Sequence, residues 1–373
     1  MELDPTPALP TTVTNLVVDR ASIGVTELRT TTLAPLADGH VRLSIDRFAL
    51  TANTITYAQF GDMLAYWDFY PLAEPNGFGN VPAIGWATVT ESLVDGIEPG
   101  SRYFSWYPMA TSIDVLATAT SDGFRDDGAH RSPHAPTYRS FVRTDRDPLY
   151  SGTDDEGRHA LLRGLFLTGF LIDAYFAANE YLGAEQAVVL SASSKTAIGY
   201  AFSARLADDG SRPRLVGVTS PSNVEFVRDL EMYDEVVTYD DLSSIAQVPS
   251  VVVDMAGSGS AVAAVHRRLG DLIVHSMVVG KSHRDAPPEA IEAGPQPEMF
   301  FAPGEIQTRL AEWGVDGYRQ RISSSLAGFV DDSRRWLHEH SVAGPDAARA
   351  AWNEAFAGAV APSVGVLVTL HAP

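Results

Sequence analysis

A rhythm of short apolar runs, separated by helix-sized segments, dominates the middle of the chain. The runs are rich in β-branched residues and lie at residues 187–190, 215–219, 235–238, 251–254 and 272–279. Such runs are typical of parallel strands, because helices cover both faces of a parallel sheet. The pattern therefore predicts an α/β fold, with a doubly wound parallel sheet over residues 156–298.

The first run leads into a turn of small residues and then into a helical run that starts near Ala197. Strand, turn and helix in this order are typical of a dinucleotide phosphate site, where the backbone approaches the phosphates and the helix N-terminus favours negative charge. The predicted phosphate-binding residues are Ser191, Ser193, Ser194, Lys195 and Thr196.

Two other interpretations of this turn remain open. Serine and alanine stand at the usual glycine positions, so the segment could be a plain serine-rich turn. Ser194-Lys195-Thr196 also resembles part of a nucleotide-triphosphate loop, but that loop needs glycines before its lysine, and residues 190–194 contain none.

The second run ends in Thr219-Ser220-Pro-Ser-Asn223, which contains no acidic residue. Sites for NAD usually carry a carboxylate at the end of this strand, and that carboxylate would repel the 2′-phosphate of NADP. The hydroxyl and amide groups of Thr219, Ser220 and Asn223 therefore favour NADP as the cofactor. The alternative is that these residues only form a turn and cap the next helix.

Composition excludes several classes of protein. The formal net charge of −20 argues against nucleic acid as a partner, because phosphate binding requires a basic surface. The absence of cysteine excludes disulfides, thiolate zinc sites and a cysteine nucleophile. The N-terminus lacks the pattern of a signal peptide, and Arg163 and Asp173 interrupt the longest apolar segment, so we expect a cytoplasmic protein that is not bound to a membrane.

The two ends of the chain have a different pattern of apolar and polar residues from the middle. Residues 41–48 alternate apolar and polar side chains, and residues 88–93 and 102–106 behave similarly, which predicts a small β barrel or sandwich within residues 1–155. Helical segments then precede a final apolar strand at residues 364–370. We expect residues 299–373 to rejoin the first domain.

Several segments, in this order, resemble the medium-chain dehydrogenase/reductase superfamily. They are the loop around Asn53, residues 82–104, Thr137-Tyr-Arg-Ser-Phe-Val142, Val251-Val-Val-Asp-Met-Ala-Gly257 and residues 275–280. The resemblance is closest to the zinc-free quinone and enoyl reductases, and to a bacterial branch classified as a domain of unknown function. It implies a GroES-like β domain with an inserted Rossmann domain, and a homodimer.

The resemblance also implies further site residues. Thr168, Ala256, Gly257, Val279 and Gly280 match positions that lie beside the cofactor in the superfamily. Asn53, Tyr57 and Tyr70 match the region that lines the active-site cleft, and they are the predicted catalytic residues. Zinc-dependent members bind their metal with a cysteine, so no metal is expected here; the spacing of His130 and His134, in a loop, is a weak alternative.

Taken together, these patterns predict a metal-free NADP-dependent oxidoreductase. It would transfer hydride to or from a carbonyl or a conjugated enone or enoyl compound, and the aromatic residues between Tyr57 and Tyr70 indicate an apolar-tolerant small-molecule substrate. One alternative is an NADP-bound lyase or isomerase that uses transient oxidation. Another is a nucleotide-binding protein without catalytic activity.

Overall fold

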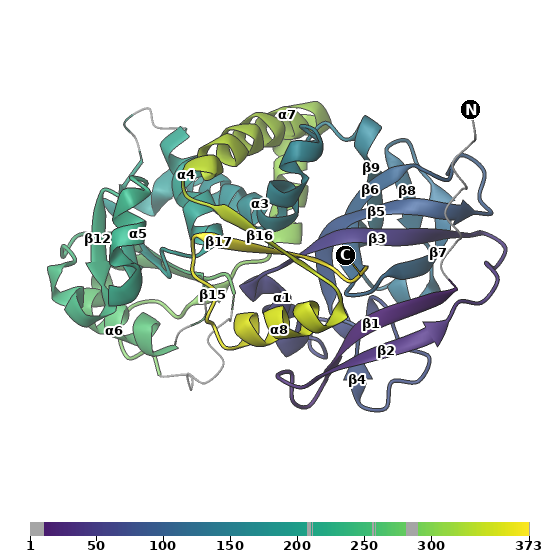
Figure 1. The fold of residues 1–373 in the computed structure, drawn as a ribbon. Helices are drawn as coiled ribbons and strands as arrows, with labels where there is room; N and C mark the ends of the chain where they lie inside the picture. The colour runs from purple at the N-terminus through teal and green to yellow at the C-terminus, as the bar shows by residue number, and fades with distance from the viewer. Residues whose placement is uncertain are drawn as a thin grey trace. The chain divides into compact units, whose positions relative to one another are not determined.

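The computed structural model describes residues 11–206, 210, 212–255, 257, 259–280 and 290–372 (Figure 1). The chain divides into two compact units. Unit 1 comprises Met1–Leu161, Glu339–Val360 and Gly365–Pro373, and unit 2 comprises Leu162–His338 and Ala361–Val364. The return to unit 1 therefore begins at Glu339 and not at residue 299 as expected, because residues 299–338 pack within unit 2.

Unit 1 is built around an antiparallel sheet in the order β16-β17-β3-β5-β6-β9-β8-β7, and an additional β3–β7 pairing closes six of these strands into a barrel. The strands are β3 (His40–Leu50), β5 (Pro82–Ser92), β6 (Arg102–Pro108), β7 (Ser112–Ala119), β8 (Gly123–Asp126), β9 (Ser140–Arg143), β16 (His338–Ala343) and β17 (Val364–Thr369). A smaller sheet has the order β2-β1-β4, with β1 (Thr12–Asp19), β2 (Thr26–Thr32) and β4 (Phe78–Gly79). The β-rich first part predicted from the sequence thus forms a closed barrel.

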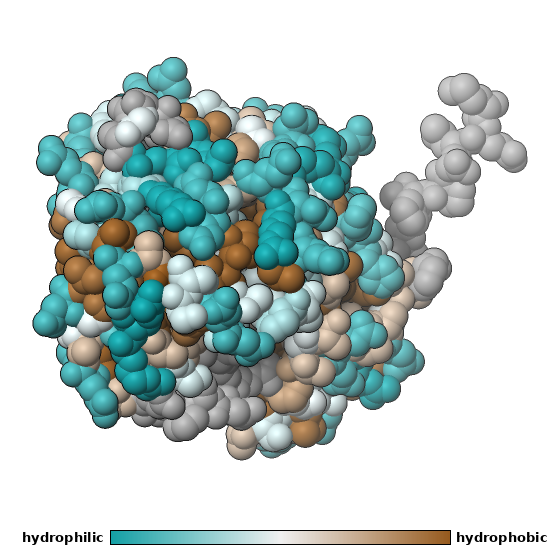
Figure 2. All heavy atoms as spheres, turned by 90° about the vertical axis from the view of Figure 1, so that its left-hand side faces the viewer, coloured by the Kyte–Doolittle hydropathy of each residue, from teal (hydrophilic) through white to brown (hydrophobic). Residues whose placement is uncertain are grey.

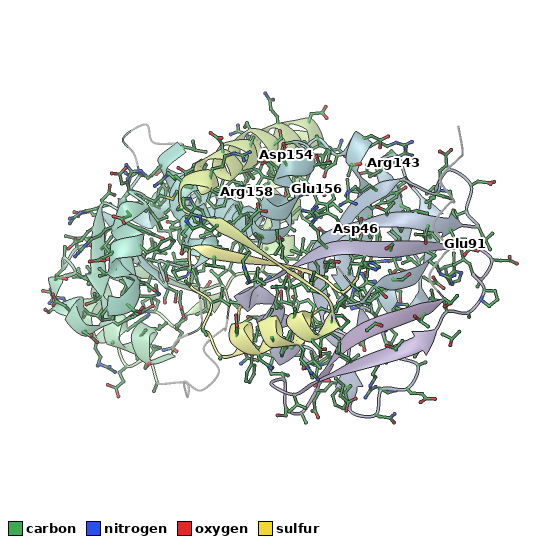
Figure 3. All side chains as sticks on the ribbon, viewed as in Figure 1. Asp46, Glu91, Arg143, Asp154, Glu156 and Arg158 are labelled. Carbon is green, nitrogen blue, oxygen red and sulfur yellow. The ribbon has the colours of Figure 1, made fainter. Side chains whose placement is uncertain are left out.

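Among the described residues, the α-helices that lie entirely in unit 1 are α1 (Ala52–Gln59), α2 (Pro136–Arg139) and α8 (Pro345–Phe356). The longer α3 (Glu156–Ala178) begins in unit 1, where a charged network ties its first residue to the barrel. Arg102 of β6 forms ion pairs with Asp46 of β3 and with the buried Glu156, and Figure 3 labels both carboxylates. The Trp86 indole also donates to the Glu156 carbonyl oxygen at 2.9 Å. The network fixes the start of α3 on the barrel.

Unit 2 contains a parallel sheet in the order β12-β11-β10-β13-β14-β15. The strands are β10 (Gln186–Leu190), β11 (Arg214–Thr219), β12 (Glu235–Thr238), β13 (Ser250–Asp254), β14 (Ile273–Val278) and β15 (Glu298–Met299). If the strands are numbered 1 to 6 along the chain, their order in the sheet is 3-2-1-4-5-6. This is the doubly wound arrangement, in which strands are added towards one edge first and then, from strand 4 on, towards the other edge. The predicted parallel sheet is therefore confirmed, and its reversal lies between β10 and β13.

In the described part of unit 2, the α-helices are the rest of α3, α4 (Lys195–Leu206), α5 (Val224–Asp229), α6 (Gly259–Leu269) and α7 (Ala302–Asp332), which breaks at Gly314. Two glycines let α3 and α4 approach closely. A Cβ added at Gly169 would lie 2.4 Å from the Tyr200 nitrogen, and one at Gly199 would lie 3.1 Å from the Phe166 Cα. Larger residues at either position would force the helices apart.

By length and composition alone, the helical segment Thr153–Ala178 could cross a membrane, and half of its most apolar window is buried inside the protein. A core helix passes the same test, so this segment is only weak evidence for a membrane span. Figure 2 shows hydrophilic side chains over much of one face of the molecule, with smaller hydrophobic patches between them.

Candidate functional site

The backbone of the turn between β10 and α4 is hydrogen-bonded to two tyrosine hydroxyls. Ser191 adopts φ 57°, a left-handed conformation that favours glycine, and its N–H donates to the Tyr239 hydroxyl at 2.8 Å. The Tyr233 hydroxyl donates to the carbonyl oxygen of the next residue, Ala192, at 3.0 Å. Tyr233 precedes β12 and Tyr239 follows it, so tyrosines at both ends of one strand bind a turn that lacks glycine. We call Tyr233 and Tyr239 the tyrosine clasp.

A glycine in β11 makes room for this clasp. A Cβ added at Gly217 would lie 2.8 Å from the Tyr233 ring and 3.1 Å from the Ala192 Cβ. The turn itself contains no glycine, but a glycine is required at position 217 of the neighbouring strand, because Tyr233 packs against it.

The same turn leaves backbone donors available at the start of α4. Ser194 acts as the cap, because its hydroxyl accepts from the Ala197 N–H at 3.3 Å. Within the part of the chain that the structure describes, the N–H groups of Ser193, Lys195 and Thr196 have no hydrogen-bond acceptor. Such donors at a helix N-terminus suit phosphate oxygens, so the residues present fit a dinucleotide pyrophosphate.

The Lys195 side chain contacts the backbone of a segment far away in the sequence. Its ammonium donates to the carbonyl oxygens of Val364 at 3.0 Å and Pro362 at 3.3 Å. Burial lowers the pKa of Lys195 to about 8. The side chain therefore contacts the returning segment Ala361–Val364, and the Lys195 backbone N–H is one of the donors available to a phosphate.

The end of β11 lies beside this turn. The Asn223 amide donates to the Ser193 hydroxyl at 3.2 Å, and the Ser220 and Ser222 hydroxyls are 3.0 Å apart. Thr219 is buried. Ser193, Ser220 and Asn223 thus gather polar groups at the carboxyl ends of β10 and β11, where a doubly wound sheet binds its ligand.

The remaining residues predicted to bind the cofactor lie outside the turn between β10 and α4. The Val279 N–H donates to the Asp254 carbonyl oxygen at 2.8 Å, and a Cβ at Gly280 would lie 2.8 Å from the Met255 carbonyl oxygen, so the ends of β13 and β14 are close. Gly257 has φ 69°. The Thr168 hydroxyl donates to the Gly164 carbonyl oxygen of its own helix at 3.1 Å. Ala256 lies outside the described residues.

In unit 1, α1 brings two predicted catalytic residues together. A capping box between Thr51 and Thr54 starts this helix, and the four-residue spacing of Asn53 and Tyr57 then places both on one face. The Asn53 amide donates to the Tyr57 hydroxyl oxygen at 2.8 Å. The Trp106 indole of β6 donates to the same oxygen at 3.4 Å.

These contacts leave the Tyr57 hydroxyl as a hydrogen-bond donor. Its oxygen accepts two hydrogen bonds, and no described residue accepts its proton. Burial raises the pKa of the Tyr57 phenol by more than the two accepted hydrogen bonds lower it, so the group keeps its proton at neutral pH. Tyr57 can therefore donate to an oxygen that gains negative charge.

Tyr70, the third predicted catalytic residue, is used differently. Its hydroxyl donates to the Trp106 carbonyl oxygen, and its ring lies 5.1 Å from the Arg131 guanidinium. Burial raises the pKa of Tyr70. Because its proton is already donated to the backbone, Tyr70 supports β6 and does not join Asn53 and Tyr57.

The region also contains aromatic residues that were not predicted to be catalytic. Tyr66 and Trp106 were expected only as core or as the wall of an apolar site, and both contact Tyr57. Tyr138, which was not singled out in the sequence, packs against Tyr66 and Trp106. His134, the weak metal candidate, instead hydrogen-bonds through Nε2 to the Ala65 carbonyl oxygen at 2.9 Å. Among the described residues, no group of three or more histidine, aspartate or glutamate side chains could hold a metal ion.

Solved structures share this fold at low sequence identity. CurA from Vibrio vulnificus in complex with NADPH is 14% identical, with a TM-score of 0.61 and coverage of 96% of this chain and 100% of that chain. The Etr1p/NADP/crotonyl-CoA complex is 14% identical, with a TM-score of 0.55 and coverage of 96% and 99%. A mutant enoyl thioester reductase from Candida tropicalis is 13% identical, with a TM-score of 0.54 and the same coverage.

These similarities show that the chain shares the fold of these solved structures over nearly its whole length. A search of the curated proteins finds no match. A family model does match, over residues 48–361 and hence most of the chain. The protein therefore belongs to the family described as "Protein of unknown function (DUF2855)".

Proposed function

We propose that the protein is a metal-free, NADP-dependent reductase of conjugated carbonyl compounds. The observation that carries this proposal is the Tyr57 hydroxyl, which accepts hydrogen bonds from Asn53 and Trp106 and keeps its own proton to donate. A donor of this kind stabilises the oxygen of a carbonyl group as charge develops on it. Unit 1 would then be the GroES-like catalytic domain.

The cofactor would be bound by unit 2 as a Rossmann domain. The free N–H groups of Ser193, Lys195 and Thr196 would hold the pyrophosphate, and Ser220 and Asn223 would receive the 2′-phosphate without an acidic residue to repel it. Two of the similar solved structures are described as complexes with NADPH or NADP, which supports the same choice here.

The reduction adds one hydride and one proton across the conjugated system. A bound reduced nicotinamide supplies the hydride, and it is oxidised as the substrate is reduced. Tyr57 donates its hydrogen bond to the carbonyl oxygen, and water replaces any proton that it transfers. Asn53 and Trp106 orient the phenol and stabilise negative charge on its oxygen.

We further propose that two copies associate through the edge strand β15. β15 ends the parallel sheet, and Met299 and Phe301 beside this edge are 68% and 67% exposed. Unpaired strand edges and exposed apolar side chains favour association with another chain. Light scattering of the wild type and of Met299→Lys tests the proposal, which predicts a dimer for the first and a monomer for the second.

Ligand-dependent melting tests the cofactor, because a ligand that binds the folded state raises the melting temperature. NADP and NADPH should raise it more than NAD. If no dinucleotide shifts the melting temperature at millimolar concentration, the cofactor proposal fails.

Absorbance of the reduced nicotinamide then tests the reaction with a panel of enones and ketones. The proposal predicts NADPH oxidation together with the saturated product. Product formation without a net change in NADPH absorbance would instead support the lyase or isomerase alternative.

A further inference from the structure

Three aromatic rings from three different segments form one cluster beside the Tyr57 phenol. The Tyr66 ring lies 4.6 Å from that of Tyr57, and Tyr138 meets Tyr66 edge-on at 6.2 Å and Trp106 at 5.2 Å. At these separations aromatic rings attract one another. Tyr57 is buried, whereas Tyr66, Trp106 and Tyr138 are partly exposed. We call these three partly exposed rings the aromatic wall.

Two anchors fix the segment that carries the first ring of the wall. The adjacent Trp67 side chain packs so closely on two glycines that a Cβ at Gly61 or Gly79 would lie within 2.1 or 2.5 Å of it. On the other side, the Ala65 carbonyl oxygen is hydrogen-bonded to His134 at 2.9 Å. A wall that is already ordered loses little conformational freedom when a ligand binds.

The wall and the hydroxyl donor together define the chemistry of a ligand. The free proton of Tyr57 requires an acceptor such as a carbonyl oxygen. The rings of Tyr66 and Tyr138 favour a flat π system over an alkyl chain of similar size, because stacked and edge-on ring pairs gain attraction beyond the apolar area that they bury. A carbonyl group conjugated to an aromatic ring meets both requirements.

We propose that the substrate is a conjugated carbonyl compound that carries an aromatic ring, and that Tyr66 and Tyr138 select for this ring. The proposal rests on the proposed function, because it places the aromatic wall and Tyr57 in one substrate site. It adds the substrate class and two specificity-determining residues.

Equilibrium binding of two matched ligands to the full-length protein tests the selection. Benzylideneacetone is compared with its cyclohexyl analogue, which keeps the carbon skeleton and the enone but has a saturated ring. The wild type should bind the aromatic ligand about threefold to tenfold more tightly. Tyr66→Leu and Tyr138→Leu should each bring the ratio of the two dissociation constants towards one, whereas Tyr66→Phe should preserve it.

Tyr318→Leu is the matched control, because it removes a tyrosine ring from α7 of unit 2 that lies outside the aromatic wall. It should retain the wild-type ratio. Equal binding of both ligands by the wild type overturns the proposal, as does an unchanged ratio in Tyr66→Leu and Tyr138→Leu, or no binding of either ligand at millimolar concentration. If a leucine variant does not fold, the wild-type ratio and Tyr66→Phe still decide the outcome.

Failure of the proposed function gives a different result. Benzylideneacetone would then bind with the expected ratio while no carbonyl compound causes NADPH oxidation. Conversely, oxidation of NADPH with both ligands and equal dissociation constants would retain the reductase and remove the aromatic selection.

Discussion

Tyr57 of unit 1 and the two tyrosines that support the turn in unit 2 use their hydroxyls in different ways. In unit 2, Tyr233 donates to the Ala192 carbonyl oxygen and Tyr239 accepts from the Ser191 N–H, so both hydroxyls support the backbone of a turn. In unit 1, Tyr57 accepts two hydrogen bonds and retains its proton. The comparison teaches that the role of a tyrosine depends on which of its donor and acceptor positions the fold already occupies.

The largest expected effect comes from removing the Tyr57 hydroxyl, which accepts two hydrogen bonds and keeps its own proton to donate. Tyr57→Phe should lower kcat/KM for enone reduction about 10²-fold to 10³-fold, because the developing oxyanion loses its hydrogen bond. Steady-state NADPH oxidation measures the loss. A decrease smaller than about threefold would show that Tyr57 does not serve the reaction.

Tyr70→Phe provides the contrast within the same unit. Its hydroxyl already donates to the Trp106 carbonyl oxygen, so the substitution should lower the free energy of unfolding by about 1–3 kcal/mol. Urea denaturation measures this change. If Tyr70→Phe reduced kcat more than Tyr57→Phe, the assignment of the two tyrosines would be reversed.

The next effect concerns side chains of unit 2 that are expected to contact the ligand directly. Ser220→Asp places a carboxylate at the end of β11, where NAD-binding sites carry one. The ratio of NADPH to NADH affinity should fall about tenfold to a hundredfold, because the carboxylate repels the 2′-phosphate. Titrations with both cofactors measure the ratio, and an unchanged ratio would place the 2′-phosphate elsewhere.

A smaller effect should follow from loosening the tyrosine clasp. Tyr239→Phe leaves the Ser191 N–H without its acceptor, which destabilises the left-handed turn and should weaken NADPH binding about tenfold. The affinity for NADH should fall by the same factor, because the turn binds the pyrophosphate that both cofactors share. Selective loss of one cofactor would contradict a purely supporting role for Tyr239.

The sequence predicted those features that depend on neighbouring residues. Strand, turn and helix follow one another directly around Ser191, and the four-residue spacing of Asn53 and Tyr57 is sufficient to pair them once a helix is assumed. The parallel sheet was likewise visible in its apolar runs, because each strand is buried on both faces. Features of this kind can be predicted from the sequence without a structure.

Features that depend on distant residues were not predictable in this way. Tyr239 meets Ser191 across 48 positions, and Trp106 meets Tyr57 across 49. Tyr70 matched a catalytic pattern, but the packing of β6 directs its proton to a carbonyl oxygen. Lys195 was predicted to contact phosphate because it lies in the turn, yet its ammonium contacts carbonyl groups more than 160 positions away. Nothing in a local pattern encodes such partners.

The smallest expected effect tests whether Lys195 belongs to the scaffold. The pKa of Lys195 is lowered to about 8 from the usual 10.5, so between these values the unfolded chain binds more protons than the folded protein. The wild type should therefore gain stability as the pH rises from 8 towards 10.5, by about 1 kcal/mol after allowance for partial exposure.

Lys195→Met should lack this pH-dependent gain, and it should also lose the two hydrogen bonds to Val364 and Pro362. Urea denaturation of both proteins at several pH values between 8 and 10.5 isolates the lysine, because the tyrosines that titrate above pH 10 cancel in the difference. If the two curves stay parallel while Lys195→Met loses affinity for NADPH but not for NADH, the ammonium meets the 2′-phosphate after all. Parallel loss of both cofactors would instead follow from a weakened turn, because the lysine anchors the helix whose N–H groups are offered to the pyrophosphate.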